Sequence, residues 1–282
     1  MNPWFPVSPL LRLSAGAGEA AAVEPASAGD RLFLRARSSA GQSSGLIIRR
    51  SLVRIQAGPL TTNLFVPGWG ATAALYARGL PADWEPLDPP TFRATRGELC
   101  AYRRWLEAEI ARRRTPVSVA GHSMGGALAV LAAADRPEQI AELILLSPSG
   151  LPVTKPIRAS LAAFVGQVVR GSYPARELCR ATAAAVAAPM SALRLARAVQ
   201  ALDLTHELEQ IRTHGIRCTV IGCTTDELIT PAHCRRLAEL LGASYREVCA
   251  PDGHIWMITH PELLTAELAT RQAVSERSPP NE

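Results

Sequence analysis

Residues 116–134 read PVSVAGHSMGGALAVLAAA, and this stretch decides the fold class. It begins with a short apolar run typical of a buried strand and ends in an Ala- and Leu-rich segment typical of a buried helix. Between them stands Gly121-x-Ser123-x-Gly125, which predicts a sharp turn with a strained serine whose hydroxyl is pushed outward. A side chain at either glycine would strike the neighbouring strand or helix. The helix would point its unpaired amino-terminal N–H groups at that hydroxyl.

The segments on either side of this stretch repeat its alternation of strand and helix. Residues 98–113 have apolar side chains at helical spacing with charges between them. Further strands are predicted at residues 63–66, 143–146, 217–221 and 245–249. Strands that alternate with helices indicate an α/β protein, with a parallel sheet covered by helices on both faces.

Length and composition exclude several classes of protein. The chain has 282 residues, 48% of them hydrophobic, which suits one large domain. It has no run of about 18 apolar residues, so integral membrane association is not expected. Six cysteines without a Cys-x-x-Cys pair argue against a zinc ribbon or a disulfide scaffold and indicate reduced thiols in the cytoplasm. The net charge is +5, but seven Arg against three acidic residues in 1–60 supply +4, so nucleic-acid binding is not expected.

Residues 1–60 differ from the rest of the chain in amino-acid composition and hydrophobic pattern. Residues 1–30 are rich in Pro, Ala and Gly, which is typical of disorder, and the same is expected of the tail 276–282. Residues 35–59 can be encoded by codons that form the D, anticodon and T arms of a transfer RNA in order. We interpret them as a wrongly assigned extension that is translated from a neighbouring tRNA gene, with the true start near Leu60. The alternative is a basic tail that contacts an acidic partner.

The chain resembles the α/β-hydrolase superfamily over residues 61–275. The resemblance implies an α/β-hydrolase fold, with a mostly parallel sheet, helices on both faces, and a small helical cap inserted after the strand at 143–146. The core would comprise residues 61–151 and 212–275, and the cap would comprise residues 152–211. About six strands are expected, because the hairpin with which relatives begin is missing if residues 35–59 are tRNA-derived.

The resemblance also implies a catalytic triad. Ser123 is the nucleophile, Asp226 in the loop after the penultimate strand is the acid, and His254 in the loop after the last strand is the base. A serine hydroxyl needs an imidazole to take its proton, and a carboxylate must orient that imidazole. Two alternatives stay open for the acid. Asp226 could instead cap a helix that starts at Pro231, and Glu227 is a rival acid that lacks the family position.

Two backbone N–H groups are implied for the oxyanion hole, those of Trp69 and Met124. Relatives usually have His-Gly before the first of these positions, where this chain has Pro67-Gly68. The change removes a hydrogen bond within the loop and puts the rigidity of the loop in doubt. The mechanism needs no cofactor, and no histidine pair has metal-ligand spacing, so no metal is expected. The other histidines are assigned to the sharp turn that bears Ser123 (His122), to the start of the last helix (His260), and to surface or boundary positions (His206, His214 and His233).

The predicted cap is basic, with seven Lys and Arg residues against Glu177 between residues 152 and 200. Like charges at helical spacing repel one another unless an anion lies between them. The cap resembles that of the pimeloyl-carrier-protein methyl ester esterase subgroup, which implies an acidic carrier protein as partner. A solvated outer face and contact with anionic lipid are the alternatives. The candidate contact residues are Arg176, Arg180, Arg194 and Arg197.

These features together predict a serine hydrolase that cleaves a carboxylic ester or thioester through an acyl-enzyme. Its substrate would be a small molecule or an acyl chain. The alternative is a catalytically silent binding protein that keeps the pocket and uses the basic cap for an acidic partner.

Overall fold

The computed structural model describes residues 62–114, 116–171, 173 and 175–275, which all belong to one compact unit, Gln56–Glu282. The extension expected at 1–60, with its stretch 35–59, and the tail 276–282 lie outside the described residues. No described helix combines the length and the hydropathy that a membrane span requires.

The described residues form one sheet of six strands in the order β2-β1-β3-β4-β5-β6, and every pair of neighbours is parallel. The predicted fold class and strand number are confirmed. Five strands were predicted individually, whereas the edge strand β2 was not, because its three residues include a proline and make no apolar run. The strands are β1 (Asn63–Val66), β2 (Trp84–Pro86), β3 (Val117–His122), β4 (Ile140–Leu146), β5 (Arg217–Cys223) and β6 (Ser244–Val248).

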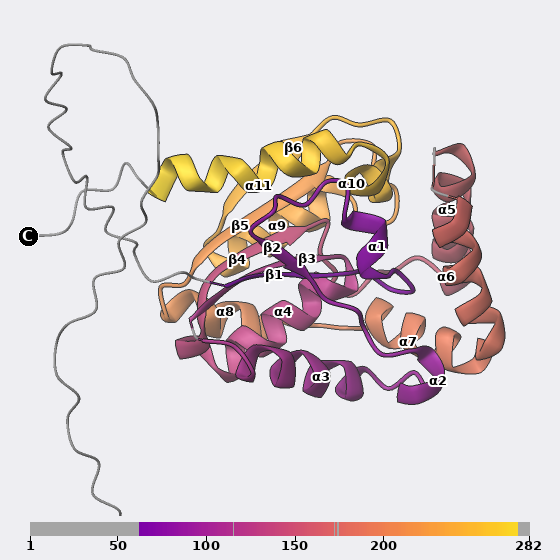
Figure 1. The fold of residues 1–282 in the computed structure, drawn as a ribbon, viewed down its shortest axis with the longest axis horizontal. Helices are drawn as coiled ribbons and strands as arrows, with labels where there is room; N and C mark the ends of the chain where they lie inside the picture. The colour runs from indigo at the N-terminus through magenta and orange to yellow at the C-terminus, as the bar shows by residue number, and fades with distance from the viewer. Residues whose placement is uncertain (1–61, 115, 172, 174, 276–282) are drawn as a thin grey trace, which may run out of the picture. The chain divides into compact units, whose positions relative to one another are not determined.

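Helices cover both faces of the sheet because the strands are apolar on both (Figure 1). In β4, Leu143 and Leu145 face one hydrophobic cluster, and Ile144 and Leu146 face the other. The first cluster contains α3 (Leu99–Ala111), α4 (Met124–Asp135), α8 (Thr205–Thr213) and α9 (Pro231–Leu241). The second contains α1 (Ala73–Tyr76), α10 (Trp256–Thr259) and α11 (Pro261–Ser275).

Three helices inserted between β4 and β5 form the cap, which lies on the right of Figure 1. They are α5 (Ile157–Arg170), α6 (Ala175–Ala187) and α7 (Pro189–Gln200). The cap rests on the core partly through contacts of α7 with α3 and with α2 (Phe92–Thr95). Helix α8 begins within the range 152–211 expected for the cap and ends two residues beyond it, and it packs against α4 and α9. Two 3-10 turns, at Pro137–Gln139 and Gly253–Ile255, complete the elements.

The turn between β3 and α4 is packed too closely for side chains at its glycines. A Cβ on Gly125 would lie 2.2 Å from the carbonyl oxygen of Val66 in β1. A Cβ on Gly121 would lie 2.5 Å from the carbonyl oxygen of Gly125. Backbone atoms cannot move aside as the end of a side chain can, so this close approach requires glycine.

We expect Gly125→Ala to lower the free energy of unfolding by about 3 kcal/mol, because the added methyl group must displace β1. Urea denaturation followed by circular dichroism measures the loss. Gly215→Ala is the matched control: a Cβ at Gly215 meets nothing within 4 Å, and only its φ of 67° disfavours alanine, at a cost of about 1 kcal/mol. A loss in Gly125→Ala no larger than that in Gly215→Ala would show that the contact with β1 is relieved at little cost.

Candidate active site

The predicted catalytic residues lie at one edge of the sheet. Ser123 follows β3, Asp226 follows β5, and His254 follows β6. Trp69 follows β1, and the cap is inserted after β4. Because all the strands are parallel, their carboxyl ends meet at this edge, where ligands of open α/β sheets bind.

Ser123 occupies the strained position that the turn requires. Its φ is 52° and its ψ is −116°, a positive φ that only three described non-glycine residues have. Its own N–H donates to the carbonyl of Leu146 at 3.0 Å, which ties the turn to β4. The side chain is 8% exposed. The strain is held by the hydrogen bond and by the close packing of the turn, as is common at reactive residues.

Asp226 and His254 form a buried hydrogen-bonded pair. Asp226 Oδ2 lies 2.8 Å from His254 Nδ1, and both residues are at most 3% exposed. The other oxygen, Oδ1, accepts from the N–H groups of Leu228 at 2.8 Å and Ile229 at 2.9 Å. Three donors therefore surround the carboxylate, which holds its orientation and compensates for its loss of solvent.

The two alternatives for the acid find no support in this geometry. Helix α9 is capped by Thr230, whose hydroxyl oxygen accepts from the N–H of His233 at 3.3 Å, so Asp226 is not its cap. Glu227 contributes its backbone carbonyl, which accepts from Lys155 Nζ at 2.8 Å. Within the described residues, no hydrogen bond joins Glu227 to His254.

Ser123 and His254 line the same cavity, which has a volume of about 100 Å³. Apolar side chains of α5 and α7 and of the loop after β5 form part of its remaining wall. No hydrogen bond joins the Ser123 hydroxyl to the His254 imidazole among the residues described here. Contacts of this kind are often long before a substrate binds. We call this space the active-site cavity.

Neither the N–H of Trp69, which lines the active-site cavity, nor that of Met124, the residue after Ser123, donates to a turn or loop carbonyl of the described residues. Met124 is the first residue of α4, whose helix dipole adds positive potential there. The Trp69 ring packs against Phe92 and Phe164, and its Nε1 donates to the carbonyl of Ala192 in the cap at 3.1 Å. The cap therefore helps to position the loop after β1.

A buried chain of hydrogen bonds, which we call the relay, connects the loop after β1, the turn at Ser123 and the loop that bears His254. Sequence reasoning missed it. The N–H of Gly68 donates to Tyr76 Oη at 3.3 Å, and this hydroxyl lies 2.7 Å from His122 Nδ1. His122 Nε2 lies 3.1 Å from the carbonyl of His254, so Nε2 carries the proton and Nδ1 accepts from the tyrosine. Tyr76 holds the loop that lacks the family's histidine. No motif marks Tyr76 in the sequence.

His122 is neutral at the heart of this relay. Burial, and then the nearby His254, hold the pKa of His122 well below its ordinary value. A neutral imidazole can donate from one nitrogen and accept at the other, which the relay requires. Burial likewise raises the pKa of the Tyr76 phenol, so its proton stays in place as the donor to His122.

Gln167 of α5 is a second residue that the sequence did not single out. It is 3% exposed, and its Oε1 accepts from the backbone N–H of His254 at 2.9 Å. Its Nε2 has no hydrogen-bond partner among the described residues. The cap is therefore hydrogen-bonded directly to the loop that bears the candidate base.

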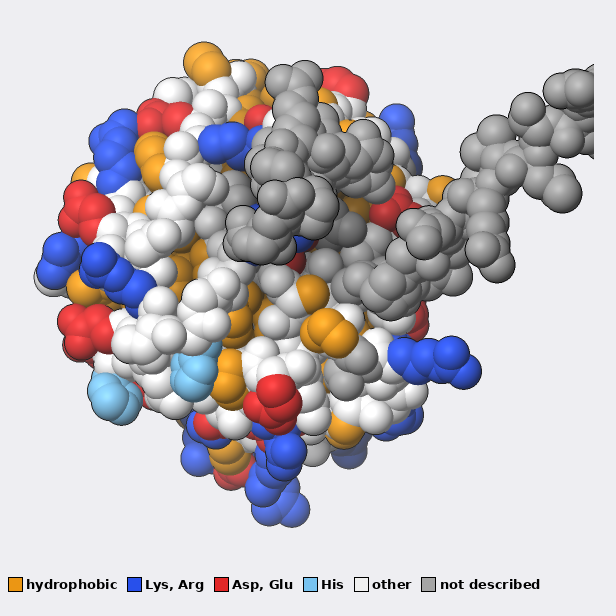
Figure 2. Space-filling view, turned by 90° about the vertical axis from the view of Figure 1, so that its left-hand side faces the viewer, with side chains coloured by type: hydrophobic (Ala, Val, Ile, Leu, Met, Phe, Trp, Pro, Cys, Tyr) orange, Lys and Arg blue, Asp and Glu red, His pale blue; other side chains and the backbone are white. Residues whose placement is uncertain are grey.

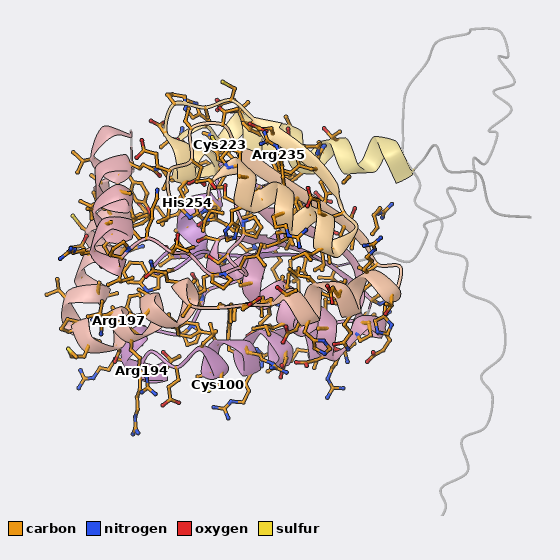
Figure 3. The ribbon with its side chains drawn as sticks, turned by 180° about the vertical axis from the view of Figure 1, so that it is seen from behind. Cys100, Arg194, Arg197, Cys223, Arg235 and His254 are labelled. Atoms are coloured by element: carbon orange, nitrogen blue, oxygen red, sulfur yellow. The ribbon has the colours of Figure 1, made fainter. Side chains whose placement is uncertain are left out.

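The cap arginines lie outside this cluster. Arg176, Arg180 and Arg197 are exposed, and none makes an ion pair with a described residue. Arg194 pairs with Glu98 at 3.4 Å. Figure 3 shows Arg194 and Arg197 on α7, well apart from His254. On the opposite face of the molecule, charges of both signs are interspersed (Figure 2).

The remaining four histidines do not line the active-site cavity. His206 and His214 are exposed, and burial lowers the pKa of the half-buried His233. His260 precedes α11 and lies 3.2 Å from Asp252. The described part of the chain contains no group of three or more His, Cys, Asp or Glu side chains that could hold a metal ion.

We expect Tyr76→Phe to lower the free energy of unfolding by about 2 kcal/mol, because it leaves the buried N–H of Gly68 and Nδ1 of His122 unpaired. Tyr245→Phe is the control. It removes the same hydroxyl, but that group hydrogen-bonds Glu247 at the surface, so about 0.5 kcal/mol should be lost. Urea denaturation measures both, and equal losses would contradict a structural role for the relay.

The fold resembles those of several solved hydrolases. An enol-lactonase from Burkholderia xenovorans LB400 is 18% identical, with a TM-score of 0.60, and the match covers 77% of this chain and 93% of that one. A bacterial membrane phospholipase A is also 18% identical, with a TM-score of 0.60 and coverage of 77% and 80%. The thioesterase domain of the curacin biosynthetic pathway is 16% identical, with a TM-score of 0.51 and coverage of 74% and 90%.

The sequence itself matches one family model over most of its described length. None of the curated proteins matches it significantly. The model of the alpha/beta hydrolase family matches residues 64–267, a range that begins in β1 and ends in α11. The range includes the strand-turn-helix at Ser123, the loops that bear Asp226 and His254, and the inserted cap. The chain therefore belongs to the alpha/beta hydrolase family.

Proposed function

We propose that the protein is a serine hydrolase that cleaves carboxylic esters or thioesters through an acyl-enzyme. The observation that carries this proposal is the buried pair of Asp226 and His254, whose imidazole lines the same cavity as the hydroxyl of Ser123. An imidazole that is oriented in this way can act as a general base toward a serine hydroxyl.

In the proposed reaction, the oxygen of Ser123 attacks the carbonyl carbon while His254 Nε2 takes the hydroxyl proton. Asp226 accepts a hydrogen bond from Nδ1 and stabilises the imidazolium that forms. The N–H groups of Trp69 and Met124 hydrogen-bond the oxyanion of the tetrahedral intermediate. His254 then gives the proton to the departing oxygen or sulfur, which leaves an acyl group on Ser123. Water, deprotonated by the same imidazole, hydrolyses that ester and restores the enzyme.

Ser123→Ala should abolish labelling by a fluorophosphonate probe and lower kcat for short p-nitrophenyl esters by several orders of magnitude. The reason is that Ser123 carries the covalent intermediate in the proposed reaction. Gel fluorescence measures the labelling, and mass spectrometry identifies the modified peptide.

Ser191→Ala is the matched control, since Ser191 lies on α7 outside the cavity that Ser123 lines. It should label like the unaltered protein. Unchanged turnover in Ser123→Ala would sink the mechanism. Absence of any adduct in the unaltered protein would favour the silent binding protein.

We further propose the cytoplasm as the place of this reaction and an acidic carrier protein as the bearer of the acyl group. Cys100, Cys179 and Cys249 are exposed and unpaired, which suits a reducing compartment. Arg176, Arg180 and Arg197 present positive charge that no described acid neutralises. The likeness of this cap to the pimeloyl-carrier-protein methyl ester esterase subgroup supports the same partner.

The double variant Arg176→Glu/Arg180→Glu should lower kcat/KM for a carrier-bound thioester by about tenfold at low salt, because surface charges steer encounter with an anionic partner. The rate on the same free thioester should not change. The control is Arg136→Glu/Arg212→Glu, which makes the same charge change at two exposed positions. Arg136 lies at the end of α4 and Arg212 lies on α8. This control should leave both rates unaltered. Equal effects of the two double variants would argue against a specific dock.

A further inference from the structure

A second and larger cavity lies within the cap. Its volume is about 580 Å³, which falls in the range of small-molecule sites, about 300–1,000 Å³. Helices α5, α6 and α7 supply most of its wall, and the loop after β1 closes one end. We call it the cap cavity.

The cap cavity adjoins the active-site cavity. Five residues line both, and three of them are the aromatic residues Trp69, Phe164 and Tyr173. The rings of Trp69 and Phe164 meet edge to face with their centroids 6.3 Å apart. The two cavities therefore share a boundary made largely of aromatic side chains, and Ser123 lines the cavity on one side of it. The other two shared residues are Leu161 and Ala196.

The lining of the cap cavity is apolar and carries no charge. Its polar side chains are those of Thr182 and Tyr173. Burial, and then the charge of Glu177, raise the pKa of Tyr173 to about 12, so its phenol is neutral. The arginines of α6 lie on the other side of the helix, because positions 176 and 180 are about half a turn from positions 178 and 185. Hydrocarbon is the chemistry that this space fits.

The cap cavity opens to solvent along an apolar rim. Val165, Val169 and Val186 line the cavity and are 56%, 77% and 71% exposed. Together with Met190 they make up the exposed large hydrophobic residues of the described chain, and all four belong to the cap. Exposed apolar side chains grouped in this way are typical of ligand-binding grooves and interaction sites.

The position of the cap cavity relative to the base indicates which half of a substrate it would hold. The leaving group must lie beside His254, because this imidazole returns the proton to it. The cap cavity is bordered by Trp69 and Gly70 of the loop after β1 and by no residue of the His254 loop. It therefore lies on the acyl side of the scissile bond. The active-site cavity is too small to take a long acyl group by itself.

We propose that the cap cavity binds the unbranched hydrocarbon chain of the acyl group, so that the substrates are medium- or long-chain fatty acyl esters or thioesters. This inference rests on the proposed function for its catalytic consequences, whereas binding of the chain does not depend on catalysis. The chain lies between α5, α6 and α7, passes the three aromatic residues, and ends with its carbonyl carbon at Ser123.

Ala181→Phe tests the proposal, because Ala181 lines the cap cavity and a phenyl group there would occupy part of the space between the cap helices. In the p-nitrophenyl series from acetate through octanoate and dodecanoate to palmitate, kcat/KM of the unaltered protein should rise with chain length. The variant should lose at least about tenfold on dodecanoate and change less than about twofold on acetate. Ala183→Phe makes the same substitution at an exposed position of α6 that lines neither cavity, and it should match the unaltered protein.

Thermal melting checks that the variants fold, and Ala181→Leu serves as the smaller filling residue if the phenylalanine prevents folding. A flat chain-length profile, or equal losses on acetate and dodecanoate, would overturn the inference while leaving the hydrolase intact.

A second measurement separates the two proposals. Dodecanoic acid should bind the Ser123→Ala protein in isothermal titration calorimetry, and adding Ala181→Phe should weaken that binding at least about tenfold. Chain binding without ester cleavage by the unaltered protein would sustain the cap cavity and refute the proposed function. Absence of chain binding, or binding that Ala181→Phe leaves unchanged, would refute the cap cavity.

Discussion

The hydrogen bond between Asp226 and His254 is the contact on which the site depends. A carboxylate with this little solvent costs several kcal/mol unless donors replace its water, and here three donors do so. Two of them are backbone N–H groups of the loop after β5, so the loop that carries the charge also satisfies it. The orientation of the imidazole is thereby fixed by the local fold of that loop before any substrate binds.

The backbone of His254, like its ring, is held by hydrogen bonds. Gln167 accepts its N–H from the cap side, and neutral His122 donates to its carbonyl from the core side. The unpartnered Nε2 of Gln167 is costly, about 1–3 kcal/mol for a buried donor. A cost of this kind is typical of functional sites, where local stability is given up for placement. The loop that bears His254, the turn at Ser123 and the loop after β1 therefore form one hydrogen-bonded unit.

The cap presents different chemistry on its two sides. Its inner side lines a hydrocarbon-like cavity, and its outer side carries arginines that are exposed to water. An amphipathic helix produces this division when its apolar residues recur every three or four positions. In α6 the inner positions are filled by small and apolar residues, which leaves space between the helices instead of a packed core. Helix α6 therefore has the composition of an ordinary basic helix, and its small side chains also leave the space of the cap cavity.

The sequence by itself determined the fold class and the need for glycine around Ser123, because these follow from sterics within one turn and from the alternation of strand and helix. The order of the predicted triad was implied by the resemblance to the α/β-hydrolase superfamily. It did not reveal β2, which is too short to form a pattern. Tyr76 and Gln167 were also missed: their partners His122 and His254 lie 46 and 87 residues away, and no local spacing encodes such contacts. The cap cavity depends on how three helices fit against one another. Only the tertiary structure decides that, because a cavity is the space that packing leaves and no residue specifies it alone.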